Sequence, residues 1–216
     1  MKMVFFNFHY RRITVRGGVW MKWYAVFVTT GKEEDVKRMF QRKLGEENCK
    51  CCIPKRKVPE KKDGQTCHVV RTMFPGYVFV HAKMDFKFYY KLMTIPNIVS
   101  FLNYSNQKDL KFHQVIQDEQ AFFKHIPDEE MSELLTLINN ENDTMEYSEF
   151  YFQNGSMTIL SGPLAGREEK IKKIDKRKKR AKISIRFLGK ENLIDIGYEA
   201  LNPLTELSDL SRGEGS

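Results

Sequence analysis

The chain has 216 residues and a formal net charge of +8 at pH 7, with 36 Lys and Arg against 28 Asp and Glu. This length suits two small domains, each with a core of its own. No run approaches the roughly 18 apolar residues of a transmembrane helix, and the N-terminal order of apolar and basic residues does not fit a signal peptide. We therefore expect a cytoplasmic protein without membrane association.

Residues 1–20 differ in pattern from the rest of the chain, and Met21 stands directly before an apolar segment. We expect translation to begin at Met21, so that residues 1–20 are a non-native or disordered extension. At the other end, we expect residues 205–216 to be a disordered tail.

Residues 21–126 predict one α+β domain. Residues 23–28 form an apolar strand, and a helix follows Gly31, with acids in its first turn where the helix dipole favours them. Gly45 ends this helix. Apolar residues recur along the helix at intervals of three and four residues, which gives it one apolar face. These residues are Val36, Met39, Phe40 and Leu44.

The rest of this domain alternates strands and helices. Asp63-Gly64 predicts a hairpin turn, and the apolar run 69–80 predicts the strongest strand. Further elements are a helix at 86–93, a strand at 98–102 and a helix from 112 or 114 to 123. This order predicts an antiparallel sheet with flanking helices, and we expect the domain to end near Ile126.

Residues 127–148 are acidic and Asn-rich, with apolar side chains at Met131, Leu134, Leu135 and Ile138. We interpret this segment as a linker with one transient helical turn. Residues 149–204 contain several short strands with Gly-rich turns, which predict a small closed β-barrel.

The most basic part of the chain lies within this second domain. Ile183, Ile185 and Phe187 alternate with polar residues, so the strand buries one face and its cations point outward. A solvated turn is the alternative interpretation, but this density of cations favours binding of RNA, DNA or another polyanion. Asp175 is the only acid among the cations, which are Lys170, Lys172, Lys173, Lys176, Arg177, Lys178, Lys179, Arg180 and Lys182.

The sequence predicts no metal site, no cofactor and no enzymatic activity. The cysteines lack the spacing of tetrahedral zinc ligands, so we expect buried or edge-strand thiols at Cys49, Cys51, Cys52 and Cys67, with His68 unliganded. The histidines likewise show no catalytic spacing, and no Gly-rich loop is arranged to cradle a phosphate.

Three motifs in order resemble the NusG-type transcription elongation factors, which join an NGN domain to a KOW domain. Residues 23–26 resemble the opening strand of that family, and residues 74–80 (Phe-Pro-Gly-Tyr-Val-Phe-Val) its internal motif. Residues 162–175 resemble its KOW signature. The resemblance implies an NGN domain at 21–126, a linker at 127–148 and an SH3-like KOW barrel at 149–204.

The resemblance also implies that the NGN domain binds the clamp helices of the largest catalytic RNA polymerase subunit. On matching positions, this function falls on Trp23, Phe74 and Tyr77. Aromatic residues are enriched at the energetic centre of interfaces. The alternative is that all three are core aromatics.

The turn within the basic segment 170–182 is similar to that of specialised paralogues in the family, especially the LoaP group of processive antiterminators. That resemblance implies recognition of a nascent RNA hairpin. One departure is Glu169, where the KOW motif has a glycine. The β-branched alternation favours a permanent barrel over the refolding domain of RfaH-like factors. We expect the RNA contacts at Lys172, Lys173, Lys176, Arg177, Lys178, Lys179, Arg180 and Arg186.

Two other functions remain open from the sequence. One is a general NusG-like elongation or termination factor that recognises no particular RNA. The other is a ribosome-associated protein that uses a KOW barrel on structured RNA. In each case we expect a monomer.

Overall fold

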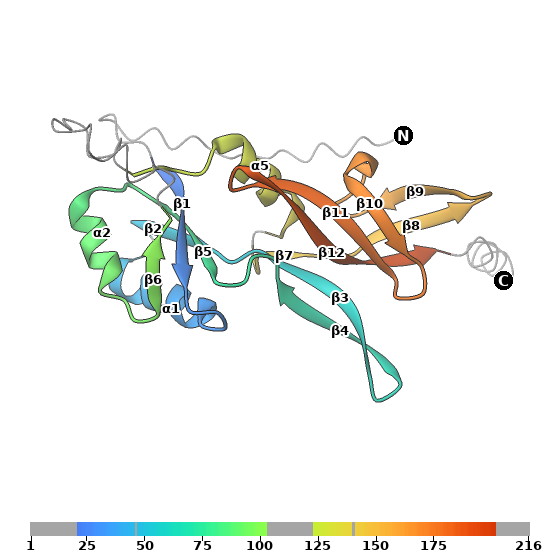
Figure 1. The fold of residues 1–216 in the computed structure, drawn as a ribbon, viewed down its shortest axis with the longest axis horizontal. Coiled ribbons are helices and arrows are strands. Elements are labelled where there is room, and N and C mark those ends of the chain that lie inside the picture. Colours follow the sequence, from blue (N-terminus) through green and yellow to red (C-terminus); the bar gives the residue numbers. More distant parts are fainter. Residues whose placement is uncertain (1–20, 46, 103–122, 140, 202–216) are drawn as a thin grey trace, which may run out of the picture.

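The computed structural model describes residues 21–45, 47–102, 123–139 and 141–201. Their strands form three sheets (Figure 1). The expected extension, the expected tail and nearly all of the expected helix that ends at Phe123 lie outside these residues. The described elements confirm an α+β fold.

The N-terminal sheet has the strand order β2-β5-β1-β6, and every neighbouring pair is antiparallel. Because side chains alternate along a strand, β1 serves two cores. Tyr24 and Val26 pack in a core with α1 and α2, whereas Trp23 and Ala25 belong to a second core on the other face. The elements are β1 Lys22–Val28, α1 Glu33–Leu44, β2 Cys49–Cys52, β5 Tyr77–Ala82, α2 Phe86–Met93 and β6 Ile98–Phe101.

The segment 69–80, predicted as one strand, is divided between two sheets. Strand β4 (Gln65–Thr72) ends before the turn, and β5 starts at Tyr77. Gly76 lies at the break with φ +82°, a left-handed conformation that glycine adopts without steric cost. A Cβ at this position would lie 3.0 Å from the ring of Phe27. The glycine therefore lets the chain pass closely from one sheet to the next.

The second sheet is built on a long hairpin. Strands β3 (Lys55–Lys62) and β4 pair antiparallel across the predicted turn, where Asp63 and Gly64 have φ of 52° and 79°. The short strand β7 (Thr144–Met145) pairs parallel with the start of β3. The outer half of the β3–β4 hairpin projects away from the rest of the molecule (Figure 1).

The segment 127–148 differs from the predicted linker with a transient helical turn. It contains the ten-residue helix α5 (Asp128–Leu137) as well as β7. Met131, Leu134 and Leu137 of this helix are buried in the core that also holds Trp23. Packing of an amphipathic face supplies the stability that such a short helix lacks in isolation, and this packing is not visible in the local sequence.

The C-terminal sheet has the order β10-β11-β12-β8-β9, with β12 and β8 parallel. As the alternation along β11 predicts, Ile183, Ile185 and Phe187 are buried. Among the described residues no ladder joins β9 to β10, so closure into an SH3-like barrel remains a prediction. The elements are β8 Ser148–Gln153, β9 Ser156–Ser161, the 3-10 helix η1 Glu168–Lys170, β10 Ile171–Asp175, β11 Arg180–Phe187 and β12 Lys190–Leu201.

Two positions of the 162–175 motif differ in what they demand of the backbone. Gly162 has φ +91°, and a Cβ there would lie 2.6 Å from the Cα of Ser148, so this close approach requires glycine. Glu169 lies in η1 and does not have a positive φ. Its replacement of the usual glycine therefore costs no left-handed strain.

Candidate functional site

The three aromatic residues expected at a partner interface lie where the N-terminal sheet meets the C-terminal sheet. Trp23 and Phe74 are each only 8% exposed, and Tyr77 is half-buried. The ring of Trp23 stacks on His81 at 4.8 Å between centroids. The rings of Phe74 and Tyr77 both pack near the ring of Phe79, with 5.8 and 6.4 Å between the ring centroids. Two of the three residues are thus core aromatics in this arrangement.

Phe187 of the C-terminal sheet covers this aromatic cluster. Its ring centroid lies 4.8 Å from that of Phe74 and 4.9 Å from that of Phe79. Helix α5 holds the same sheet in place, because Lys170 forms an ion pair with Glu133. The surface that the resemblance assigns to polymerase is therefore occupied by this chain's own C-terminal sheet.

The four residues between β10 and β11, here named the basic turn, are exposed and positively charged: Lys176, Arg177, Lys178 and Lys179. Asp175 shapes the turn by accepting a hydrogen bond from the backbone N–H of Lys178 at 2.9 Å. Lys179 has φ +50°, and Lys176 Nζ lies 4.4 Å from the ring centroid of Phe152. The turn therefore presents its cations from a defined backbone.

The structure does not bring all the predicted RNA-binding residues together. Arg186 lies near the far end of β11, about 20 Å from the basic turn at the usual rise per residue. There it lines a small surface pocket together with Lys172, Glu133 and Glu191. Lys173 is exposed on β10, opposite Lys182. The basic turn is thus one group, and Lys172 with Arg186 forms another in a mixed-charge setting.

Arg180 differs from the rest of the predicted set because it points to the β3–β4 hairpin. Its Nε and Nη2 donate to the carbonyl oxygen of Pro59 at 3.1 and 2.6 Å. Its guanidinium also lies 3.7 Å from the carboxylate of Glu60. In this arrangement Arg180 connects the C-terminal sheet to the hairpin.

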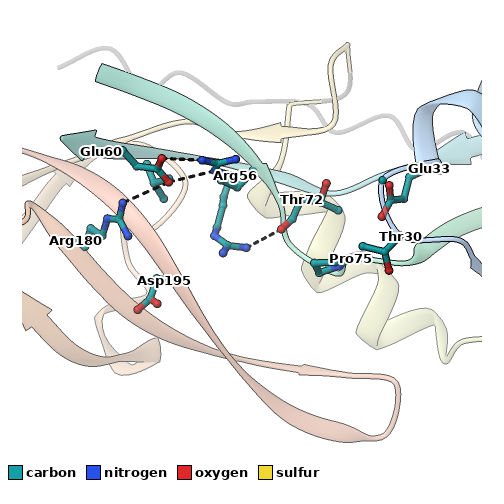
Figure 2. A pocket seen from close by; sticks show the side chains of 11 residues that line it. Thr30, Glu33, Arg56, Glu60, Thr72, Pro75, Arg180 and Asp195 are labelled. Carbon is teal, nitrogen blue, oxygen red and sulfur yellow. Dashed lines mark hydrogen bonds and ion pairs between the residues drawn. The ribbon is translucent and has the colours of Figure 1, made fainter. Parts of the chain in front are cut away.

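A pocket of about 410 Å³ opens beside Arg180, between the hairpin, the β1–α1 loop and the C-terminal sheet (Figure 2). We call it the interdomain pocket. Charged side chains from both sides of the contact dominate it. Its lining residues are Thr30, Gly31, Glu33, Arg56, Val58, Glu60, Arg71, Thr72, Pro75, Arg180 and Asp195.

Tyr147 braces the other side of the hairpin. Its hydroxyl lies 2.7 Å from His68 Nδ1, and Lys57 Nζ lies 5.4 Å from its ring centroid. Burial raises the pKa of Tyr147 to about 12, so the hydroxyl stays protonated at neutral pH. Gly197 of β12 lies so close to Tyr147 that a Cβ added to it would be 2.1 Å from the tyrosine ring.

All four cysteines are free thiols. Cys49 Sγ and Cys51 Sγ lie 3.8 Å apart. The hydrogen bond to Cys49, with burial, raises the pKa of Cys51, and burial raises the pKa of Cys52 well above its usual range. The described residues contain no group of three or more His, Cys, Asp or Glu arranged to hold a metal ion.

Sequence reasoning missed the interdomain pocket. Arg56 and Glu60 come from the 55–62 segment, whose basic residues are evident in the sequence, but nothing local indicates that they face Arg180. Phe187 was correctly expected to be buried, yet its partners lie on another sheet. Both features depend on contacts between residues more than 100 positions apart.

Comparison with known proteins resolves the family. A family model described as "Transcription termination factor nusG" matches residues 21–135. The chain belongs to the NusG family. The match covers the N-terminal sheet, the hairpin and most of α5, and therefore agrees with the resemblance of residues 23–26 and 74–80.

Relatives match over a larger share of the chain than the family model does. The "Transcription termination/antitermination protein NusG" of Helicobacter pylori is 21% identical over 82% of this chain and 94% of its own length. The protein of the same name from Staphylococcus epidermidis is 23% identical over 85% and 96%. A solved structure described as "Domain interaction in Thermotoga maritima NusG" matches with TM-score 0.47 and 22% identity, over 82% of this chain and 94% of that chain.

The NusG family assignment places the chain among transcription factors and agrees with the expectation of a non-enzyme. Among the residues described, no helix has both the length and the apolar character to cross a bilayer.

Proposed function

We propose that this chain is a transcription elongation factor and processive antiterminator that binds RNA polymerase and a nascent RNA hairpin. Residues 21–126 act as the NGN domain, and residues 149–204 act as a KOW domain with an SH3-like barrel. The single observation that carries the RNA function is the basic turn, where four exposed cations follow one another on a backbone held by Asp175. Such a cluster binds phosphates and loses affinity as salt rises.

The polymerase contact rests on the aromatic cluster. Trp23, Phe74 and Tyr77 offer the aromatic side chains that dominate interface energetics, and family membership supports this partner. Because Phe187 covers Phe74 at 4.8 Å, polymerase binding requires the C-terminal sheet to leave. Polymerase then shifts the equilibrium toward the separated arrangement, since a ligand favours the state that it binds better.

The two contacts act together. RNA bound by the KOW domain raises the local concentration of the NGN domain near polymerase, so neither contact must be tight alone. Bridging the clamp opposes the open, pausing-prone polymerase, and the factor travels through downstream terminators.

RNA binding tests the proposal directly. The probes are stem-loop RNAs of differing loop sequence with single-stranded flanks, at two salt concentrations. We compare the wild type with a variant that changes Lys176, Arg177, Lys178 and Lys179 to alanine. Its control removes four exposed cations of the N-terminal part, by changing Arg42, Lys83, Lys87 and Lys91 to alanine.

Selective, salt-sensitive binding that the basic-turn variant loses and the control retains would support the antiterminator. Weak binding without selectivity, unchanged in the basic-turn variant, would contradict it and favour a general NusG-like factor. Copurification of the tagged chain with ribosomal subunits rather than polymerase would favour the ribosome-associated alternative.

A further inference from the structure

The walls of the interdomain pocket come from two parts of the chain. Arg56 and Arg71 lie on the β3–β4 hairpin, whereas Arg180 and Asp195 lie on the C-terminal sheet. Figure 2 shows the side chains of Arg56 and Arg180 on neighbouring elements with the open space beside them. The pocket exists only while these two parts are in contact.

Three carboxylates line the same pocket, but each has a partner. Glu33 accepts a hydrogen bond from the backbone N–H of Gly76 at 2.7 Å. Glu60 accepts two hydrogen bonds from Arg71, at 2.7 and 3.1 Å. Asp195 forms an ion pair at 3.7 Å with Lys182, which lies outside the lining. Glu60 and Asp195 are therefore each paired with a cation, whereas Glu33 keeps its charge and is held by a backbone N–H.

Arg56 is the arginine of the pocket for which no ion pair is found among the described residues. Its Nη1 donates to the carbonyl oxygen of Thr72 at 2.9 Å, while its Nε is buried and has no hydrogen-bond partner. Burial lowers the pKa of Arg56; Asp195 opposes this effect, and Arg180 and Arg71 add to it. A buried donor without a partner and a guanidinium beside two others both destabilise the free protein.

An anion beside Arg56 in the pocket would offset the repulsion among the three guanidinium groups. Arginine binds phosphate oxygens through paired N–H groups, which makes a phosphate group the matching ligand. Arg180 directly follows the basic turn, so RNA held by the turn has its backbone next to the pocket entrance. The pocket volume of about 410 Å³ leaves room for a nucleotide around the phosphate.

We propose that the interdomain pocket binds a phosphate group of the RNA held by the basic turn, with Arg56 as its central ligand. This inference rests on the RNA-binding function proposed above. The β3–β4 hairpin of the NGN domain is then part of the RNA surface. In the free factor, RNA in the pocket favours contact between the hairpin and the C-terminal sheet. When polymerase displaces that sheet, the pocket contact is lost and the basic turn alone holds the RNA.

The test is Arg56→Met in the full chain, with the stem-loop RNA that binds the wild type most tightly as the probe. We expect an unchanged or higher Tm, because a guanidinium with a buried, unpartnered Nε is removed. We expect the RNA affinity to fall about tenfold at low salt, and the slope of log K against log salt to weaken by about 0.7. Arg42→Met is the control, since Arg42 is exposed at the opposite end of α1 from the pocket.

A second variant separates charge from geometry. Arg56→Lys keeps the cation but loses the paired donors, so we expect the salt slope of the wild type with a weaker affinity. A lower Tm for Arg56→Met together with unchanged RNA affinity would overturn the inference and leave Arg56 as a structural partner of Thr72.

Two further comparisons identify the source of a failure. If the basic-turn variant loses RNA binding and Arg56→Met does not, the inference fails while the proposed function stands. If the basic-turn variant also binds normally, the proposed function itself fails. Adenosine monophosphate is the free-nucleotide probe. Suppose that it raises the Tm of the wild type but not of Arg56→Met, and that both proteins bind RNA equally. The pocket would then bind a phosphate group from a free nucleotide, and the proposal that this phosphate belongs to RNA would be wrong.

Discussion

Phe187 on β11 packs against Phe74, in the turn before β5, with 4.8 Å between the ring centroids. The two residues are 113 positions apart, and their contact joins the C-terminal sheet to the aromatic cluster of the N-terminal part. The basic turn lies at the other end of β11. One strand therefore carries both the residue that covers the proposed polymerase surface and the start of the proposed RNA surface.

Replacing Phe187 with alanine tests whether this contact closes the molecule. The ring is fully buried, so we expect the free energy of unfolding to fall by about 3 kcal/mol and the two parts to separate more often. Amide NMR signals of residues 21–102 should shift, and polymerase should bind more tightly. Phe152→Ala is the control, because Phe152 contacts Tyr198 within the C-terminal sheet. Weaker polymerase binding by a folded Phe187→Ala protein would contradict the closed state.

Gly197→Ala tests the contact between β12 and the hairpin. The added Cβ would lie 2.1 Å from Tyr147 Cε1 and 2.8 Å from Pro59 Cδ. The ring of Tyr147 can move, but the pyrrolidine ring of Pro59 is bonded to the backbone nitrogen of β3, so the strand must shift. We expect a loss of about 1–3 kcal/mol in unfolding free energy and faster hydrogen exchange at the backbone of β3. Unchanged exchange at β3 would show that Tyr147 alone absorbs the change.

Asp143 ties the segment after α5 to the N-terminal part. Its carboxylate pairs with Lys37 Nζ at 2.6 Å and accepts from the N–H of Ile53 at 3.0 Å. Burial lowers the pKa of Lys37, but the hydrogen bond and charge of Asp143, together with Cys52 and Glu34, raise it above its ordinary value. We expect Asp143→Ala to cost about 3 kcal/mol of unfolding free energy, because it leaves a largely buried cation unpaired.

The Lys37→Met and Asp143→Ala double variant checks the cause of that loss. Removing the orphaned cation should recover part of the stability, giving a favourable coupling in a double-mutant cycle. Strict additivity of the two losses, measured by urea unfolding, would rule out the ion pair as the cause.

The free energy of unfolding should depend on pH because of His81. Burial lowers the pKa of His81 from its ordinary value of 6.5, and nearby Lys50 lowers it further. The unfolded chain therefore binds this proton at a higher pH than the folded chain. Stability should fall as the pH drops below 6.5, until the folded pKa is passed. His81→Gln should remove this component, as measured by urea unfolding between pH 7 and pH 5. An equal slope in the two proteins would exclude His81 as its source.

The local sequence was sufficient for the elements that carry their own signals. The apolar face of Val36 and Phe40 predicted α1, Asp63-Gly64 predicted the hairpin turn, and the alternation through Ile183 predicted β11. Each of these depends on periodicity or turn geometry within a few residues. The family resemblance rested on other local motifs, at residues 23–26, 74–80 and 162–175, and the family model confirms the family over residues 21–135.

Tertiary structure decided what those elements contact. Helix α5 was misinterpreted as a transient turn because its stability comes from packing Met131 and Leu134 between two sheets. The direction of Arg180 toward Pro59, and the unpartnered Nε of Arg56, depend on the hairpin meeting the C-terminal sheet. Local charge density and hydrophobic periodicity are properties of neighbouring residues, so the sequence determined them. Burial and pairing across more than 100 residues arise only when distant surfaces meet, so only the folded chain decided them.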